Sequence, residues 1–535
     1  MTGTFCQIRP LASHLRPVRD RVGLAPMLAA LLLPSSIAAA QLFERATVIR
    51  GARVVLADGT YLDPGDVLIK GEKIQEVGAK LELSFADRLT AKTIDGSGKT
   101  VTPGIIDAWS GLGRAGAADQ PDATASAWDA FNSYAMDDFS EARQNGVTAV
   151  FLSPGGNPGI KGLGVVVQLR VNENGSAGKL LAPEAALCID LGSEESAIAR
   201  MRTFQSVRKK FRAAVDYRKS LEDYEEELKE YLEKLKERQG EKQKGEDTGK
   251  KGAKEESPPK EPEKEKPSEK PEPTPGESER SPVGSGDFVD VMIQAKLTST
   301  SADDSSDAGA ARKDEPAPPD ASKKDGDDKK KEDEPKKPTK PKFDPASEML
   351  LRAIDHKLPV RIEAHRSADI LNALELADEY NLDTILEGGT DAYLVANRIA
   401  EADAPVVLGK TTRTELFEPN EFRRHREENA AWLGHWGVPF TIGTGGDPSA
   451  ARFAAANAQL ALSSMPIARD RNSIAWLRAV TSDAARVIGV GDRIGRLHKG
   501  MQADVVIWSG DPSDPASRVE QVLVAGKVVY PLPEN

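Results

Sequence analysis

The chain is poor in the side chains that build metal, thiol and redox sites. Its 535 residues include two cysteines and six histidines. The sequence contains no CxxC pair, no HExxH or GxSxG motif and no Walker loop, so the chemistries that depend on those motifs lack their residues. Cys188 lies in an apolar stretch, for which a buried, unreactive thiol is expected.

The chain also has few hydrophobic residues for one compact enzyme. They make up 39% of the sequence, while charged residues make up 29%. This balance predicts a solvated segment beside a folded domain of ordinary composition. The net charge of −12 argues against a general nucleic-acid binder, so no nucleic-acid partner is expected.

Long hydrophobic runs are scarce too. The run from Val22 to Leu33 follows several arginines and precedes the small residues Ala38 to Ala40, an order typical of a secretory signal peptide. The run is shorter than the ~20 residues that span a bilayer. We therefore expect residues 1–40 to be a cleaved signal and the mature protein to be periplasmic or secreted, without a transmembrane segment. The alternative is an uncleaved membrane anchor.

Strand-like runs separated by turns fill both ends of the chain, and strands alternating with amphipathic helices fill its middle. This order favours parallel βα units beside one composite β domain, because chain termini often lie close together. The predicted parts are residues 41–101 and 489–535 for the β domain, and residues 102–219 and 342–488 for the α/β domain.

An insertion separates the two α/β parts. Residues 220–238 predict a helix that begins at the N-cap Ser220 and carries apolar residues at heptad spacing. So few repeats support packing on the parent domain as well as a coiled coil. Residues 239–341 are rich in Lys, Glu, Asp and Pro and are expected to be disordered, because they cannot bury enough apolar surface. They are interpreted either as a docking arm for a partner or as a tolerated loop expansion.

Several sequence pieces, in order along the chain, carry a family resemblance. They are Val101–Gly113 (VTPGIIDAWSGLG), Pro359–Arg366 (PVRIEAHR), Leu386–Leu394 (LEGGTDAYL), Phe440–Pro448 (FTIGTGGDP) and Ile494–Trp508 (IGRLHKGMQADVVIW). Together they resemble the imidazolonepropionase-like branch of the amidohydrolase superfamily. The resemblance implies a (β/α)8 TIM-type barrel with a small β-sandwich built from both chain ends. It also implies a metal site at the carboxyl ends of the barrel strands and hydrolysis of non-peptide carbon–nitrogen bonds.

The metal ligands of the family do not carry over to this chain. Four histidine positions and one aspartate position of the family fall on Trp109, Gly111, Glu363, Gly388 and Gly445. Tryptophan and glycine have no side chain that binds a metal. The resemblance therefore implies a degenerate site.

A few donors remain near those positions. Asp107 is expected to anchor the turn after the first strand, while Glu363, His365 and Asp447 are weak candidates for metal ligands. Asp447 lies two residues beyond Gly445 and is the candidate catalytic residue.

Three hypotheses follow. In the first, the barrel has lost metal hydrolysis, needs no cofactor, and is plugged by Trp109 or holds a small molecule or peptide at its mouth. In the second, the protein hydrolyses carbon–nitrogen bonds with zinc or another divalent metal bound by carboxylates. In the third, the barrel is a scaffold and partners bind residues 239–341.

Overall fold

The computed structural model describes residues 46–56, 59–116, 122–192, 196–248, 336–409, 425–447, 449–463 and 475–531. The predicted signal peptide lies outside the described residues, and so does most of the insertion expected to be disordered. No helix in these ranges combines the length and the apolar composition that crossing a bilayer requires. The chain divides into two units, of which residues 225–339 form the smaller.

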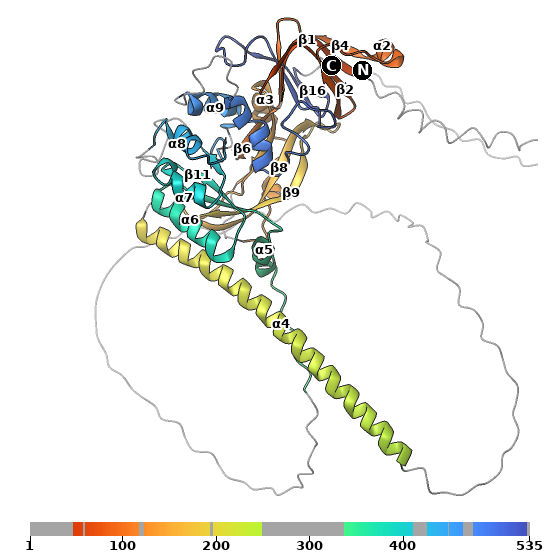
Figure 1. The fold of residues 1–535 in the computed structure, drawn as a ribbon, viewed down its shortest axis with the longest axis vertical. Coiled ribbons are helices and arrows are strands. Elements are labelled where there is room, and N and C mark those ends of the chain that lie inside the picture. The colour runs from red at the N-terminus through yellow and green to blue at the C-terminus, as the bar shows by residue number, and fades with distance from the viewer. Residues whose placement is uncertain are drawn as a thin grey trace, which may run out of the picture. The chain divides into compact units, whose positions relative to one another are not determined.

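Strands from both ends of the chain share one sheet, and β1, β2, β4 and β16 lie in the same part of the molecule (Figure 1). The strand order is β16-β15-β14-β5-β1-β2-β3, with β4 beside β1. These strands are β1 (Thr47–Val55), β2 (Tyr61–Lys70), β3 (Lys73–Gly78), β4 (Lys92–Asp95), β5 (Thr100–Pro103), β14 (Val505–Trp508), β15 (Val519–Val524) and β16 (Lys527–Tyr530). The helix α2 (Phe85–Thr90) precedes β4. The two chain ends meet where β5 pairs with β14, and they share an apolar core that includes Ile49, Val67, Val505 and Leu523. The expected meeting of the chain ends is found here, while a two-layered sandwich stays a prediction.

The second sheet has the order β13-β12-β11-β10-β9-β8-β7-β6. Its strands are β6 (Ile105–Ser110), β7 (Val147–Leu152), β8 (Gly159–Val171), β9 (Ala177–Asp190), β10 (Val360–Ala364), β11 (Thr384–Gly388), β12 (Val406–Leu408) and β13 (Phe440–Ile442). The first and last strands come together, because the N–H of Thr444, just after β13, donates to the carbonyl of Trp109 at 3.0 Å. The sheet is therefore a nearly closed barrel, in agreement with the coarse expectation of a TIM-type α/β fold.

One strand departs from the (β/α)8 expectation. β8 is antiparallel to both β7 and β9, while the other neighbouring pairs are parallel. Residues 153–158 and 172–176, which join these strands, form no helix. Antiparallel strands need only such short connections, whereas parallel neighbours need a crossover. The prediction of a helix after every strand is therefore wrong in this part of the barrel.

Helices follow most of the parallel strands. The shorter ones are η1 (Ala127–Ala130), α3 (Met136–Gln144), α5 (Pro345–Ile354), α6 (Ser367–Tyr380), η2 (Ala392–Leu394), α7 (Ala396–Glu401), α8 (Asn429–His435), η3 (Ala451–Phe453), α9 (Ala454–Leu462), α10 (Ala475–Ala479) and α11 (Ser482–Val487). They bury one face each; in α6, Ile370, Ala373 and Leu374 are buried at helical spacing. α6 ends at Asn381, which adopts the left-handed conformation that often closes a helix.

The longest helix is α4 (Ala197–Thr248). Its first turns pack on the parent domain: Phe211 is buried and lies 5.1 Å from the ring of Tyr380 in α6. Arg200 forms an ion pair with Asp369 at 3.1 Å. The predicted start at Ser220 is wrong, because the Ser220 hydroxyl donates to the carbonyl of Tyr217 within the helix. Residues 239–248 are helical as well, although disorder was expected there.

Candidate functional site

Three functional side chains share one face of β10 and its end. Arg361, Glu363 and His365 are two residues apart, and side chains two apart in a strand point the same way. This face is the barrel interior, because Arg361 donates to the carbonyl of Ala108 in β6 at 2.7 Å. Arg361 also pairs with the buried Glu387. Glu363 and His365 lie further along, at the carboxyl end of β10.

A lysine opposite Glu363 is presented by a bulge in β8. The strand register breaks between Ile160 and Gly162, and the residue between them is Lys161. Gly162 has φ +115° and passes so close to the segment before η1 that an added Cβ would lie 2.3 Å from the Ala125 carbonyl oxygen. Only glycine fits there, and a bulge re-aims the side chain that it displaces. The bulge thus places the Lys161 side chain in the barrel mouth.

The ammonium of Lys161 bridges two carboxylates. Its Nζ lies 2.9 Å from Oδ2 of Asp190 and 2.7 Å from Oε2 of Glu363. The side chains of Lys161, Asp190 and Glu363 are only 11%, 2% and 13% exposed. Charge-assisted bonds of this length are strong where water is excluded.

The protonation states follow from this bridge. Burial opposes the charge of Lys161, but Glu363 and Asp190 outweigh it and raise the pKa of Lys161 above its ordinary value. Burial also opposes ionisation of Glu363, but Lys161 and His365 hold its pKa at about 2. Lys161 is therefore a fixed cation and Glu363 a fixed anion across the physiological range.

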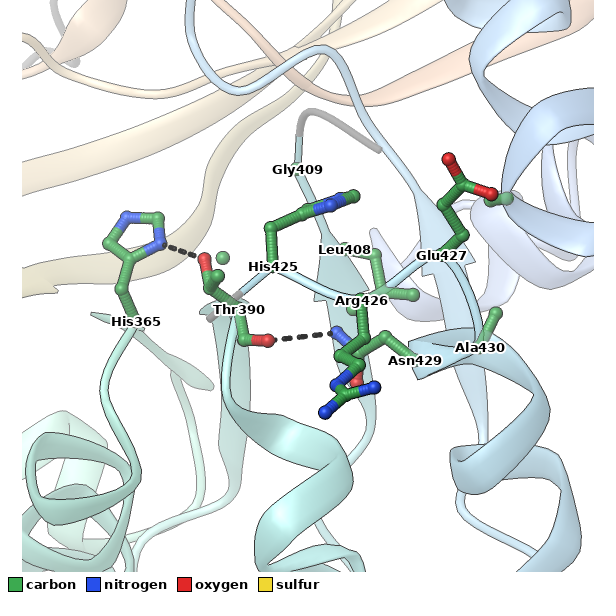
Figure 2. A pocket seen from close by; sticks show the side chains of 11 residues that line it. His365, Thr390, Leu408, Gly409, His425, Arg426, Glu427, Asn429 and Ala430 are labelled. Carbon is green, nitrogen blue, oxygen red and sulfur yellow. Dashed lines mark hydrogen bonds between the residues drawn. The ribbon is translucent and has the colours of Figure 1, made fainter. Parts of the chain in front are cut away.

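His365 lies beside this bridge. Its Nδ1 is 3.0 Å from the hydroxyl of Thr390, and its Nε2 is 3.5 Å from Oε1 of Glu363. Figure 2 shows the bond to Thr390 among the side chains that line a pocket. This cavity, which Asn429 also lines, has a volume of about 20 Å³. That volume holds about one water molecule.

The imidazole of His365 fills the space beside Gly388. A Cβ at Gly388, which has φ +88°, would lie 2.5 Å from Cε1 of His365. The expected ligand position on β11 therefore has no room for a side chain, because a residue from the end of β10 occupies it.

Trp109 is packed against glycines from two other strand ends. An added Cβ would lie 2.7 Å from Cζ3 of Trp109 at Gly409 and 2.6 Å from its Cβ at Gly443. A Cβ at Gly446 would lie 3.3 Å from the indole Nε1. The indole is 5% exposed, so it fills the part of the mouth that these glycines leave open.

Asp107 joins the first strand to the last. Its Oδ1 accepts hydrogen bonds from the N–H of Thr444 and of Trp109, and its Oδ2 accepts the Thr444 hydroxyl at 2.6 Å. Burial raises the pKa of Asp107 to about 6, although these bonds act to lower it. This is the anchoring role expected for Asp107. Gly111, just beyond β6, contributes backbone only: its carbonyl accepts the N–H of Arg114.

Asp447 lies in the turn after β13. Its Oδ1 accepts the N–H and the hydroxyl of Ser449, both at 2.9 Å. Gly445, at the expected aspartate position, has φ +76° and belongs to the same turn. Arg114 links this turn to β7 by donating to the carbonyls of Gly446 and Ser153.

The described side chains of the barrel mouth are not arranged as ligands of a divalent metal. In the described part of the chain, no three His, Cys, Asp or Glu side chains are grouped so that they could hold an ion. The trio Glu363, His365 and Asp447 therefore does not form a ligand set. The point on which Glu363 and Asp190 converge holds the ammonium of Lys161.

Sequence reasoning missed Lys161 and Asp190. A signal was present for both: Lys161 interrupts the run Gly-Ile-Lys-Gly-Leu, and Asp190 ends the apolar run Ala-Ala-Leu-Cys-Ile-Asp. The prediction for Cys188 is confirmed, since the thiol is buried and burial raises its pKa to about 12.

Residues 338–530 match the amidohydrolase family. The amidohydrolase match covers β10 to β16, which includes Glu363, His365 and Asp447. The imidazolonepropionase-like branch stays a prediction.

The chain is similar in fold to a solved amidohydrolase structure. An amidohydrolase from Thermotoga maritima MSB8 superposes with a TM-score of 0.58 at 22% identity, over 90% of this chain and 99% of that chain. A Xaa-Pro dipeptidase with bound methionine gives a TM-score of 0.44 at 10% identity, over 90% of this chain and 99% of that chain. An adenosine deaminase from Xanthomonas campestris with bound zinc gives a TM-score of 0.40 at 13% identity, over 90% of this chain and 92% of that chain. At 22% identity and a TM-score of 0.58, the likeness to the Thermotoga maritima protein shows the fold alone. No curated protein matches the chain.

Proposed function

We propose that this protein is an exported member of the amidohydrolase fold whose barrel does not perform metal-dependent hydrolysis and instead serves as a scaffold. The observation that carries the proposal is the ammonium of Lys161, held between Asp190 and Glu363 at 2.9 and 2.7 Å. A cation of the protein itself neutralises the carboxylates that a metal would need.

The chemistry of metal hydrolysis explains why this substitution matters. A catalytic metal lowers the pKa of bound water to ~7 and usually has about three protein ligands with one open position. An ammonium offers three hydrogen-bond donors and no open coordination position. Trp109, buried against Gly409 and Gly443, further reduces the space for a substrate at the described part of the mouth.

Two observations support the scaffold role: the small cavity at the described part of the barrel mouth, and the attachment of α4 to the parent domain. The cavity beside His365 holds about 20 Å³, too little for a peptide or a drug-sized ligand. The long helix α4 is fastened to the parent domain by Phe211 and by the pair Arg200–Asp369. We therefore assign partner binding to α4 and residues 239–341 in preference to the barrel mouth.

A second candidate function is hydrolysis of carbon–nitrogen bonds at a reduced site. The observation in its favour is the pair of Glu363 and His365, 3.5 Å apart, since a carboxylate beside an imidazole can orient a general base.

The two functions differ in a test on the purified mature protein, residues 41–535. The scaffold proposal expects no stoichiometric metal by elemental analysis and no cleavage of dipeptides, amides or cyclic imides, with or without added zinc. Chelator-sensitive cleavage that is lost in Glu363→Gln would establish the second function. N-terminal sequencing of the secreted or periplasmic fraction checks export, with Gln41 expected as the first residue.

A further inference from the structure

α4 carries an apolar stripe beyond its contact with the parent domain. Its members follow one another at intervals of three and four residues: Leu221, Tyr224, Leu228, Tyr231 and Leu235. All five are half-buried, whereas the residues between them are exposed. Beside the stripe, Leu232 is 47% exposed. This spacing is the seam of a two-helix coiled coil.

We propose that this stripe pairs with the same stripe of a second copy of the chain, in an antiparallel coiled coil. The charged residues beside the seam select this orientation. With the three leucines at a and the two tyrosines at d, the g positions hold Ser220, Glu227 and Lys234, and the e positions hold Glu225, Leu232 and Gln239.

In the antiparallel orientation, g positions face g positions. Glu227 then faces the partner's Lys234, and two-fold symmetry forms the pair twice. In the parallel orientation, g faces e, so Glu227 would meet Leu232 and Lys234 would meet Gln239, with no ion pair at either site. The intrahelical pair of Lys234 with Glu230 is long, 3.4 Å, and exposed, so it competes weakly.

The packing layers agree with the charges. In an antiparallel seam, a faces d, so two of the three leucines pack on tyrosines: Leu228 on Tyr231, and Leu235 on Tyr224. A parallel seam would place tyrosine against tyrosine. The inference depends on α4 alone and holds whether or not the barrel is catalytic, so its failure leaves the proposed function intact.

Sedimentation equilibrium of the mature protein tests the proposal. We expect a monomer–dimer equilibrium that Leu228→Asp abolishes, while circular dichroism stays unchanged. Glu227→Lys and Lys234→Glu should each weaken the dimer about tenfold through loss and repulsion of two pairs, and the double exchange should restore it. Glu226→Lys, on the outer face, is the matched control and should leave the dimer constant unchanged.

Three outcomes would overturn the proposal. A wild-type chain that stays monomeric at high concentration would leave the stripe to an intramolecular occupant. A dimer that survives Leu228→Asp would use another surface. A dimer that is lost in Leu228→Asp but indifferent to both single charge reversals would be parallel.

Discussion

At the scale of single residues, the glycines at the strand ends decide which large side chains fit into the barrel mouth, where Trp109 and His365 occupy the space beside them. Sequence reasoning identified Trp109, Gly388 and Glu363 as departures from the family pattern. It did not identify the charged partners of Glu363, because Lys161 and Asp190 come from β8 and β9. The ion pairs of Lys161 with Asp190 and Glu363 depend on the strand register of β8 and on its bulge, and a single sequence does not specify that register.

Removing the bridging cation should destabilise the fold. Lys161→Met leaves Asp190 and Glu363 facing each other without compensation, and we expect a loss of about 3–5 kcal/mol in the free energy of unfolding, measured with urea. Adding Glu363→Gln should recover part of the loss. Lys357→Met, at a lysine with 66% exposure, is the control and should cost little. Equal stability of Lys161→Met and wild type would show that the bridge is unimportant.

Asp107 should make stability depend on pH. Its carboxyl keeps its proton up to about pH 6 in the folded state, whereas the unfolded chain loses it near pH ~4. The folded state therefore binds more protons between these values, and stability falls as pH rises through this window, by up to about 3 kcal/mol. Asp107→Asn should flatten that part of the profile in thermal melts. Burial also raises the pKa of Asp504 to about 6, so Asp504 lowers stability over the same pH window in wild type and in Asp107→Asn. The difference between the two stability profiles therefore reports Asp107 alone.

At the scale of elements, the short parallel strands and their helices could be predicted, and the β8–β9 hairpin could not. β8 and β9 are long and mostly buried, so the alternation that reveals a strand is missing. Sequence reasoning placed the start of α4 at Ser220 because serine is a favoured N-cap residue. In the structure, Ser220 lies inside the helix. Charged residues with good helix propensity continue on both sides of it.

The β8 bulge should depend on its glycine. Gly162→Ala adds a Cβ 2.3 Å from a backbone oxygen at φ +115°, and we expect a loss of about 2–4 kcal/mol. Gly175→Ala, in the neighbouring turn, has φ +78° with nothing within 4 Å. This control should cost only the backbone strain, about 1 kcal/mol. Equal losses in denaturant melts of the two variants would contradict the close approach described for Gly162.

At the scale of the whole molecule, the fold class could be predicted because several pieces, such as Val101–Gly113, resemble a family of known fold and occur in the expected order. The arrangement of the charged side chains in the barrel mouth required the structure. A list of missing histidines leaves open whether carboxylates replace them. The distances of 2.9 and 2.7 Å from one ammonium to two carboxylates show where those carboxylates are engaged.

The most direct test of this account is a calorimetric titration of residues 41–535 with zinc. We expect no binding at the barrel mouth, and therefore the same heat profile for wild type and for Glu363→Gln. One zinc ion bound per chain by the wild type, and lost in Glu363→Gln, would show that Lys161 yields its place to a metal and would contradict the account.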